Sequence, residues 1–277
     1  MAYEKLGQSP LDYMPCRYGA SKLLFRGPRR EFDAPYVACL GGTETYGKFI
    51  EAPFPALLEA RTGVTCVNFG LPNAGIDVFL NDPGVLSIAN NARLVVLQVP
   101  PALNMSNRFY TVHPRRNDRF VKASASLKSV FREVDFTEFH FTRHMLRHLR
   151  GVAPDRFDLI RDELQAAWIA RMRVLLHQVT APVALLWMSA HAPQESAASP
   201  DLVHDPAFVT CAMLDAVRPQ VACVIDATVS AEALALGSRG MVFSELEGSA
   251  ACELLGPAAH AEAAAALLPI VVEHVRI

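Results

Sequence analysis

Five short apolar runs, separated by helical and polar segments, place the strongest constraint on how this chain folds. The runs occupy residues 34–42, 64–70, 92–100, 182–190 and 221–229. Continuous apolar runs of this length are typical of parallel strands that are covered by helices on both faces. Because strands that alternate with helices build a doubly wound parallel sheet, we predict an α/β fold with five parallel strands.

The segment between the third and fourth runs breaks this alternation. Residues 105–180 are rich in Arg, His and Phe, and residues 158–179 have apolar side chains at the spacing of an amphipathic helix. We therefore predict one domain over residues 1–277, with an N-terminal extension at 1–33 and a helical insertion, after the third strand, at about 105–180.

The composition argues against several classes of protein. Hydrophobic residues make up 51% of the 277 residues, enough for a full core, and the net charge of −2 gives no basic field for nucleic acid. Six cysteines without a C-x-x-C pair are typical of core residues in a reducing compartment. The first residues lack an export signal, and no apolar run approaches the roughly 20 residues of a membrane span. We expect a cytoplasmic protein with no membrane span and no cofactor; the oligomeric state stays open.

The first strand ends abruptly on the stretch GGTETYG, residues 41–47. In open α/β sheets the ligand lies at the carboxyl ends of the strands, where this stretch presents backbone N–H groups and small hydroxyls. Thr43 is therefore the first candidate for a functional side chain. The alternative is that Thr43 caps the helix that follows it.

Four blocks of sequence at strand ends carry a family resemblance. They are "LGGTETYG" (40–47), "VNFGLPNAG" (67–75), "LQVPPALNMSN" (97–107) and "GPAAHAEAAAAL" (256–267). In order and strand context they resemble the blocks of the SGNH (GDSL-type) hydrolase family. The resemblance implies a flavodoxin-like, SGNH-like sheet and an esterase or acyltransferase activity.

The same resemblance assigns a role to individual residues. Thr43 stands where the family has its Ser nucleophile, whose hydroxyl needs an adjacent base, and His260 stands where the family has that base. The oxyanion hole would consist of the Thr43 and Gly75 N–H groups and the Asn104 side chain. Two neighbours, Gly70 and Asn107, are the alternatives for this hole.

The acidic partner of the histidine stays open. Pro257 stands where the family has the Asp that orients its base, and the preceding loop offers other carboxylates, namely Glu245, Glu247 and Glu253. A second Asp-x-x-His spacing, Asp201 to His204, follows the fourth strand instead of the fifth. Since triads are defined by geometry and roles, we prefer His260 on topology and keep His204 as the alternative.

A cluster of basic residues in the insertion offers a place for an anionic group. Its members are Arg108, His113, Arg115, Arg116 and Arg119. Guanidinium groups bind phosphate, sulfate or carboxylate through paired hydrogen bonds, so we predict that these residues bind the anionic part of a substrate. The alternative is a solvated surface whose charges pair with nearby acids.

Three histidines, His140, His144 and His148, are spaced four residues apart, so a helix would align them on one face. Apart from Glu138, no carboxylate or cysteine at ligand spacing completes a cluster, and we therefore predict no metal site.

Two hypotheses of function follow. The first is an SGNH-like esterase or acyltransferase that acts on an ester or acyl substrate with an anionic portion. The second is a binding or assembly protein that has the same fold and a degenerate catalytic site. The whole chain also resembles a poorly characterised bacterial family in the stretches "NMSNRFYTVHPRRNDRF" and "EVDFTEFHFTRHML", and this second resemblance implies no activity.

Overall fold

Five parallel strands form the centre of the protein in a computed structural model that describes residues 11–195, 202 and 205–275. The strands are β1 (Tyr36–Gly41), β2 (Thr65–Gly70), β3 (Leu94–Gln98), β6 (Val183–Ser189) and β7 (Cys223–Thr228). Their order across the sheet is β2-β1-β3-β6-β7, which is the doubly wound order of flavodoxin-like sheets. All five predicted strands and the α/β fold class are confirmed.

The buried faces of β1 explain why its sequence is continuously apolar. Val37 and Cys39 pack on one side of the sheet with Phe54, while Ala38 and Leu40 pack on the other side. Successive side chains of a strand point to opposite faces, so a strand between two layers of helices needs apolar residues at every position. Burial raises the pKa of the Cys39 thiol well above its usual range, as expected of a core cysteine.

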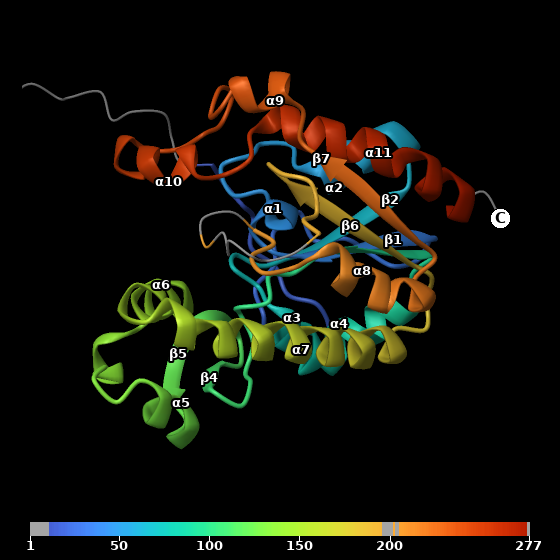
Figure 1. Ribbon diagram of the computed structural model, residues 1–277. Helices are drawn as coiled ribbons and strands as arrows, with labels where there is room; N and C mark the ends of the chain where they lie inside the picture. Colours follow the sequence, from blue (N-terminus) through green and yellow to red (C-terminus); the bar gives the residue numbers. More distant parts are fainter. Residues whose placement is uncertain (1–10, 196–201, 203–204, 276–277) are drawn as a thin grey trace, which may run out of the picture.

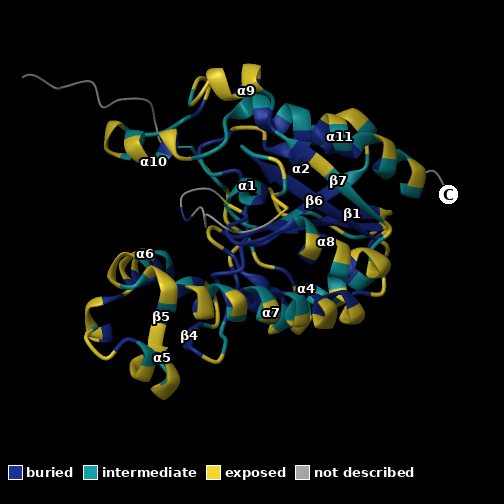
Figure 2. Cartoon of the chain, in the orientation of Figure 1, coloured by how far each residue is buried: buried dark blue, intermediate teal, exposed yellow. Residues whose placement is uncertain are grey.

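Helices cover both faces of the sheet, as Figure 1 shows. One face carries α2 (Phe54–Thr62), α9 (Ala231–Ala235) and α11 (Pro257–Val275). The opposite face carries α3 (Ile76–Leu80), α4 (Pro83–Asn90), α7 (Pro154–Gln178) and α8 (Cys211–Val217). β1, β3 and β6 are buried along their whole length between these two sets of helices, whereas the edge strand β7 is only partly buried (Figure 2).

The last helix, α11, is long and apolar enough by length and composition to cross a membrane. A helix in the core of an α/β protein can have the same length and composition. The α11 helix packs against α2 and β7, and Ala263, Leu267 and Val271 are its buried residues in this cluster. It therefore serves as part of one layer of the α/β fold.

Residues 105–152, which we call the lobe, extend to one side of the sheet (Figure 1). The lobe contains β4 (Tyr110–His113), β5 (Arg116–Ala123), α5 (Ala125–Val130), η1 (Phe136–Glu138) and α6 (Thr142–Val152). Helices lie in this segment as predicted, but β4 and β5 form an antiparallel hairpin that the sequence analysis missed. The alternation of buried Tyr110 and Val112 with half-buried neighbours is a strand pattern only four residues long, too short to stand out in a run of charged residues.

The lobe and the sheet are joined by α7 and by one buried carboxylate. Asp77 of α3 forms an ion pair with Arg171 of α7 and accepts a hydrogen bond of 2.8 Å from the N–H of Ser106. Trp168 of α7 donates a hydrogen bond of 2.9 Å to the carbonyl of Pro100, just after β3. These contacts fix the lobe beside the carboxyl ends of the strands.

The remaining elements are short. They are α1 (Thr43–Tyr46), η2 (Arg218–Gln220), η3 (Glu245–Glu247) and α10 (Gly248–Cys252). The α10 segment stands apart from the sheet in Figure 1. Near it, Met241 and Ala251 form a small separate apolar cluster with Phe49 and Ile50.

The first glycine of the GGTET stretch is required by packing. A Cβ atom at Gly41 would lie 2.0 Å from Thr45 Oγ1 and 2.7 Å from the Cβ of Gln98, so only glycine lets these two side chains meet beneath the loop. A Cβ atom at Gly42 would have only Gln98 Oε1 within 4 Å, at 3.9 Å. The strand thus ends on glycine because α1 packs directly against the ends of β1 and β3.

Replacing the two glycines separately tests this explanation. We expect Gly41→Ala to lower the free energy of unfolding by about 1–3 kcal/mol, as overpacking does, because Thr45 and Gln98 must move. Gly42→Ala is the matched control, and it should cost clearly less. Urea unfolding followed by circular dichroism measures both variants; equal losses would show that space at Gly41 is not the constraint.

Candidate functional site

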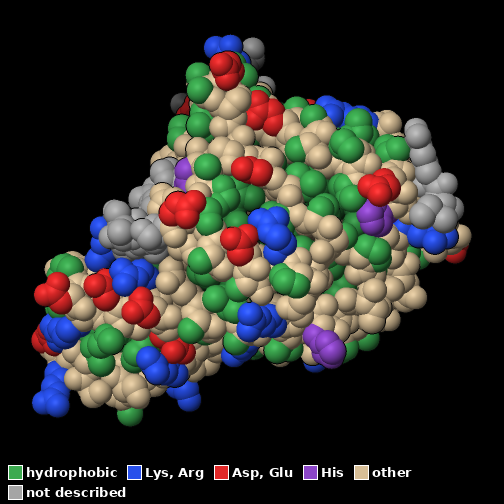
Figure 3. All heavy atoms as spheres, turned by 45° about the vertical axis from the view of Figure 1, so that its right-hand side comes forward, with side chains coloured by type: hydrophobic (Ala, Val, Ile, Leu, Met, Phe, Trp, Pro, Cys, Tyr) green, Lys and Arg blue, Asp and Glu red, His purple; other side chains and the backbone are tan. Residues whose placement is uncertain are grey.

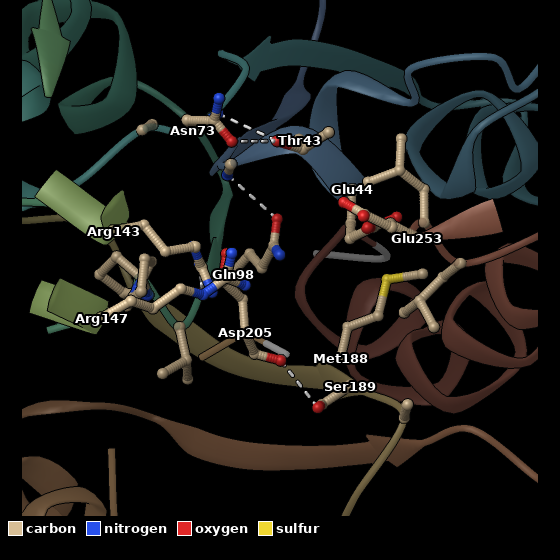
Figure 4. A pocket seen from close by; sticks show the side chains of 18 residues that line it. Thr43, Glu44, Asn73, Gln98, Arg143, Arg147, Met188, Ser189, Asp205 and Glu253 are labelled. Carbon is tan, nitrogen blue, oxygen red and sulfur yellow. Dashed lines mark hydrogen bonds and ion pairs between the residues drawn. The ribbon is translucent and has the colours of Figure 1, made fainter. Parts of the chain in front are cut away.

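A cleft of about 210 Å³ lies at the carboxyl ends of β1, β3 and β6. Its walls come from the loops after these strands, from the loop after β2, and from α6 of the lobe (Figure 4). The polar residues of the walls are Thr43, Glu44, Asn73, Gln98, Arg143, Arg147, Ser189, Asp205 and Glu253. Because β1 and β3 lie where the strand order reverses, this is the position at which doubly wound sheets bind ligands.

Thr43 lies in the wall of this cleft as the first residue of α1. The residue that caps the helix is Gly42, and the Thr43 side chain makes no capping bond. The Thr43 hydroxyl instead accepts a hydrogen bond of 3.0 Å from the N–H of Asn73, whose φ of 56° lies in the left-handed region. Thr43 therefore connects the loops that follow β1 and β2, a role that neither sequence alternative predicted.

His260 is completely buried and points to the residue after Thr43. Its Nδ1 accepts a hydrogen bond of 3.2 Å from the N–H of Phe54, so the neutral ring carries its proton on Nε2. Nε2 lies 3.6 Å from a carboxylate oxygen of Glu44. The described contacts of both side chains include no bond between His260 and Thr43, so this geometry does not support His260 as the base for Thr43, and the assignment stays a prediction. The packing of α11 on α2 draws the imidazole beneath the Phe54 ring instead.

Two of the three donors predicted for the oxyanion hole, the Asn104 amide and the Gly75 N–H, are engaged in hydrogen bonds within the protein. The Asn104 side-chain nitrogen donates a hydrogen bond of 3.0 Å to the Asn73 carbonyl. The Asn104 side-chain oxygen accepts a hydrogen bond of 2.9 Å from the Thr142 hydroxyl. The Gly75 N–H donates a hydrogen bond of 3.1 Å to the side-chain oxygen of Asn117. Neither residue lines the cleft, so these contacts do not support the two assignments, which stay predictions.

The alternatives for the hole are engaged in the same way. The Gly70 N–H donates a hydrogen bond of 2.8 Å to the side-chain oxygen of Asn68. The Asn107 side chain accepts hydrogen bonds from the N–H groups of Phe109 and Tyr110, at 2.8 and 3.1 Å.

Gln98, which the sequence analysis did not single out, holds the loop after β1 and faces the cleft. Its Oε1 accepts three hydrogen bonds: one from the Gly42 N–H and one from the Thr45 N–H, each of 3.1 Å, and one of 2.6 Å from the Thr45 hydroxyl. Because all three partners are donors, the oxygen position is fixed and the amide nitrogen lies on the other side of the group. Within the described part of the chain this nitrogen has no hydrogen-bond partner. The signal in the sequence was a single polar residue closing an otherwise apolar strand.

Two arginines of α6 form the cationic side of the cleft. Arg143 pairs with Asp205 at 2.5 Å and also donates to the Leu202 carbonyl. Arg147 donates to the same carbonyl at 3.3 Å, and no carboxylate of residues 11–195, 202 and 205–275 pairs with it. Arg143 and Arg147 are spaced four residues apart, like the histidines of the same helix, and this spacing was the signal that could have found them.

The basic residues that the sequence favoured lie elsewhere. Arg108 pairs with Glu163 at 2.9 Å, the Arg119 guanidinium lies over the Phe141 ring, and the His113 ring accepts a bond from the N–H of Arg115. Arg116 is exposed on the hairpin, and none of the five lines the cleft. Figure 3 shows basic and acidic side chains interspersed on the lobe (lower left), as in the solvated surface that was the alternative.

The remaining candidates from the sequence are the histidines of the lobe, the carboxylates proposed as partners of His260, and the second Asp-x-x-His spacing. His144 and His148 pack their rings against Phe139, and no group of three metal-ligating side chains is found among the residues that the structure describes. Glu247 bonds to Ser244 in a capping box. Glu253 alone of the three glutamates lines the cleft. Asp201 and His204 lie outside the described residues.

Apart from Asp205, which pairs with Arg143, the charged residues of the cleft are separated by sign. In Figure 4 Arg143 and Arg147 lie on one side, and Glu44 and Glu253 lie on the other. The Gln98 amide lies between these groups. The arrangement suits a ligand that has an anionic group toward α6 and a hydrogen-bond donor toward the glutamates.

The burial of His260 leads to a testable expectation. His260→Ala should lower the free energy of unfolding by about 3 kcal/mol or more, because it opens a cavity and leaves the Phe54 N–H without its acceptor. Urea unfolding measures the loss. A base exposed to the cleft would instead lose activity with little loss of stability, so a variant as stable as the wild type would contradict the packing role.

The chain belongs to the family described as "Domain of unknown function (DUF6473)", which it matches over residues 1–275. No curated protein matches it. Among solved structures, it is similar to one titled as the crystal structure of the lipase Lip_vut3 from a goat rumen metagenome. The two share 12% identity and a TM-score of 0.40, over 84% of this chain and 96% of that one.

Proposed function

We propose that this protein binds a small molecule with a carboxylate or phosphate group in the cleft, and that Arg147 is the main contact for that group. The observation that carries the proposal is a guanidinium in a cleft wall with no carboxylate partner among the described residues. Arginine presents paired donors that match the oxygens of carboxylate and phosphate. Arg147 is exposed, so salt in the solvent should weaken the attraction.

The surroundings of Arg147 support this role. Arg143 is already paired with Asp205, so its charge is largely neutralised, and it holds the Leu202 carbonyl in place beside Arg147. The Gln98 amide nitrogen supplies a further donor within the same cleft. An anion there would meet one unpaired positive charge and one neutral donor.

Exchange of arginine for glutamine at two positions tests the proposal. Arg147→Gln should weaken the binding of acetate or inorganic phosphate about 10-fold to 100-fold, the range for a hydrogen bond to a charged group. Arg116→Gln is the matched control, because Arg116 is exposed on the hairpin and outside the cleft. Isothermal titration calorimetry measures both affinities. A larger loss in Arg116→Gln would restore the cluster that the sequence favoured and overturn the proposal.

A second function, ester hydrolysis or acyl transfer by an SGNH-like mechanism, is favoured by one observation: the Thr43 hydroxyl lies in the same cleft. In that mechanism the hydroxyl attacks the ester carbonyl and the leaving alcohol takes up the proton, which requires a base. Glu44, the neighbour of Thr43, also lines the cleft. The Gln98 amide replaces Asn104 as the candidate donor to the oxyanion.

Variants of Thr43 separate the two functions. If Thr43 is a nucleophile, Thr43→Ala abolishes turnover of a small activated ester, and Thr43→Ser keeps or raises it. If Thr43 only connects the two loops, Thr43→Ala lowers the free energy of unfolding by about 1 kcal/mol, because the Asn73 N–H loses its acceptor, and anion binding persists. We expect the second result. Ester turnover that disappears only in the Ala variant would instead establish the enzyme.

A further inference from the structure

A second cavity, of about 220 Å³, lies next to the cleft and beside α9. Four residues line both spaces: Ala190, Glu253, Leu254 and Leu255. The cleft and the second cavity are therefore adjacent, and the segment 253–255 and the residue after β6 form their common wall.

The lining of the second cavity is apolar and made largely of small residues. Val229, Ala233 and Ala259 contribute side chains, and Glu253, an exposed residue, is the only charged one. Two glycine backbones approach each other in the lining, since a Cβ atom at Gly256 would lie 2.3 Å from the carbonyl of Gly237. Such a space offers water few hydrogen-bond partners but suits a hydrocarbon chain.

We infer that the second cavity accepts the alkyl or acyl chain of a ligand whose anionic head group lies at Arg147. The inference rests on the proposed function for the head group and adds the class of ligand: an amphiphile with one unbranched apolar chain. Because four residues border both spaces, the apolar space lies directly beside the cleft. The inference requires that the chain of the ligand pass along Leu254 and Leu255 from one space into the other. The common wall combines Leu254 and Leu255, which suit the chain, with Glu253 from the acidic side of the cleft.

A series of linear alkanoates from acetate to decanoate, with alkyl phosphates of equal chain length, tests the inference by calorimetry. We expect affinity to rise about fourfold for each methylene that enters the cavity and then to level off when the cavity is full. Ala233→Leu fills the cavity from α9, so it should remove the gain from long chains and leave acetate and phosphate binding unchanged. Ala235→Leu, exposed on the same helix, is the matched control and should behave as the wild type.

The outcomes distinguish the chain site from the head-group site. Affinity that does not depend on chain length, with acetate or phosphate binding still sensitive to Arg147→Gln, overturns the chain site alone. Chain-dependent binding that Ala233→Leu removes but Arg147→Gln leaves intact supports the chain site and overturns the head-group site. Absence of binding by every member of both series overturns both. If Ala233→Leu does not fold, Leu234→Trp takes its place, because Leu234 is exposed and lines the second cavity but not the cleft.

Discussion

The three hydrogen bonds accepted by Gln98 Oε1 hold together the edge of the sheet on which the cleft depends. They fix the backbone at Gly42 and the first turn of α1, and so determine where Thr43 and Glu44 lie. A buried acceptor with three donors is costly to disrupt, because each donor would be left without a partner in a low-dielectric environment. The position of Gly41 is explained by the same contact, since only glycine leaves room for Gln98 and Thr45 to meet.

A second consequence of this packing is that most polar groups near the strand ends are already used. Asn73 receives a bond from Asn104 and donates one to Thr43, while Asn117 accepts from Gly75. These bonds connect the lobe, the loop after β2 and α1 into one network. Among the described residues that line the cleft, the groups at the margin of this network that can still meet a ligand are the Gln98 amide nitrogen, Arg147 and Glu253.

The sequence predicted the sheet well because strands depend on local patterns. An apolar run of six residues requires burial on both faces whatever surrounds it, and Gly63 ends α2 in the left-handed conformation (φ 71°) that favours glycine. The site depended on distant partners. Nothing near His260 in the sequence indicates that Phe54, 206 residues away, would occupy its Nδ1, or that Asn117 would take the Gly75 N–H. Residue types at the right strand ends located the cleft, but their hydrogen-bond partners, set by tertiary packing, decided their roles.

The position of α6 shows how the insertion adds to the function of the sheet. A doubly wound sheet offers backbone donors at its strand ends but no fixed positive charge. The lobe is rich in such charge, with ten Lys and Arg against four Asp and Glu over residues 105–152. Most of it faces solvent, and only α6 contributes Arg143 and Arg147 to the cleft. Ser106 of the lobe donates to Asp77 of α3 and accepts from Arg171 of α7, and these two residues form an ion pair. The lobe, and with it the cationic side of the cleft, is therefore tied to the helices that cover the sheet.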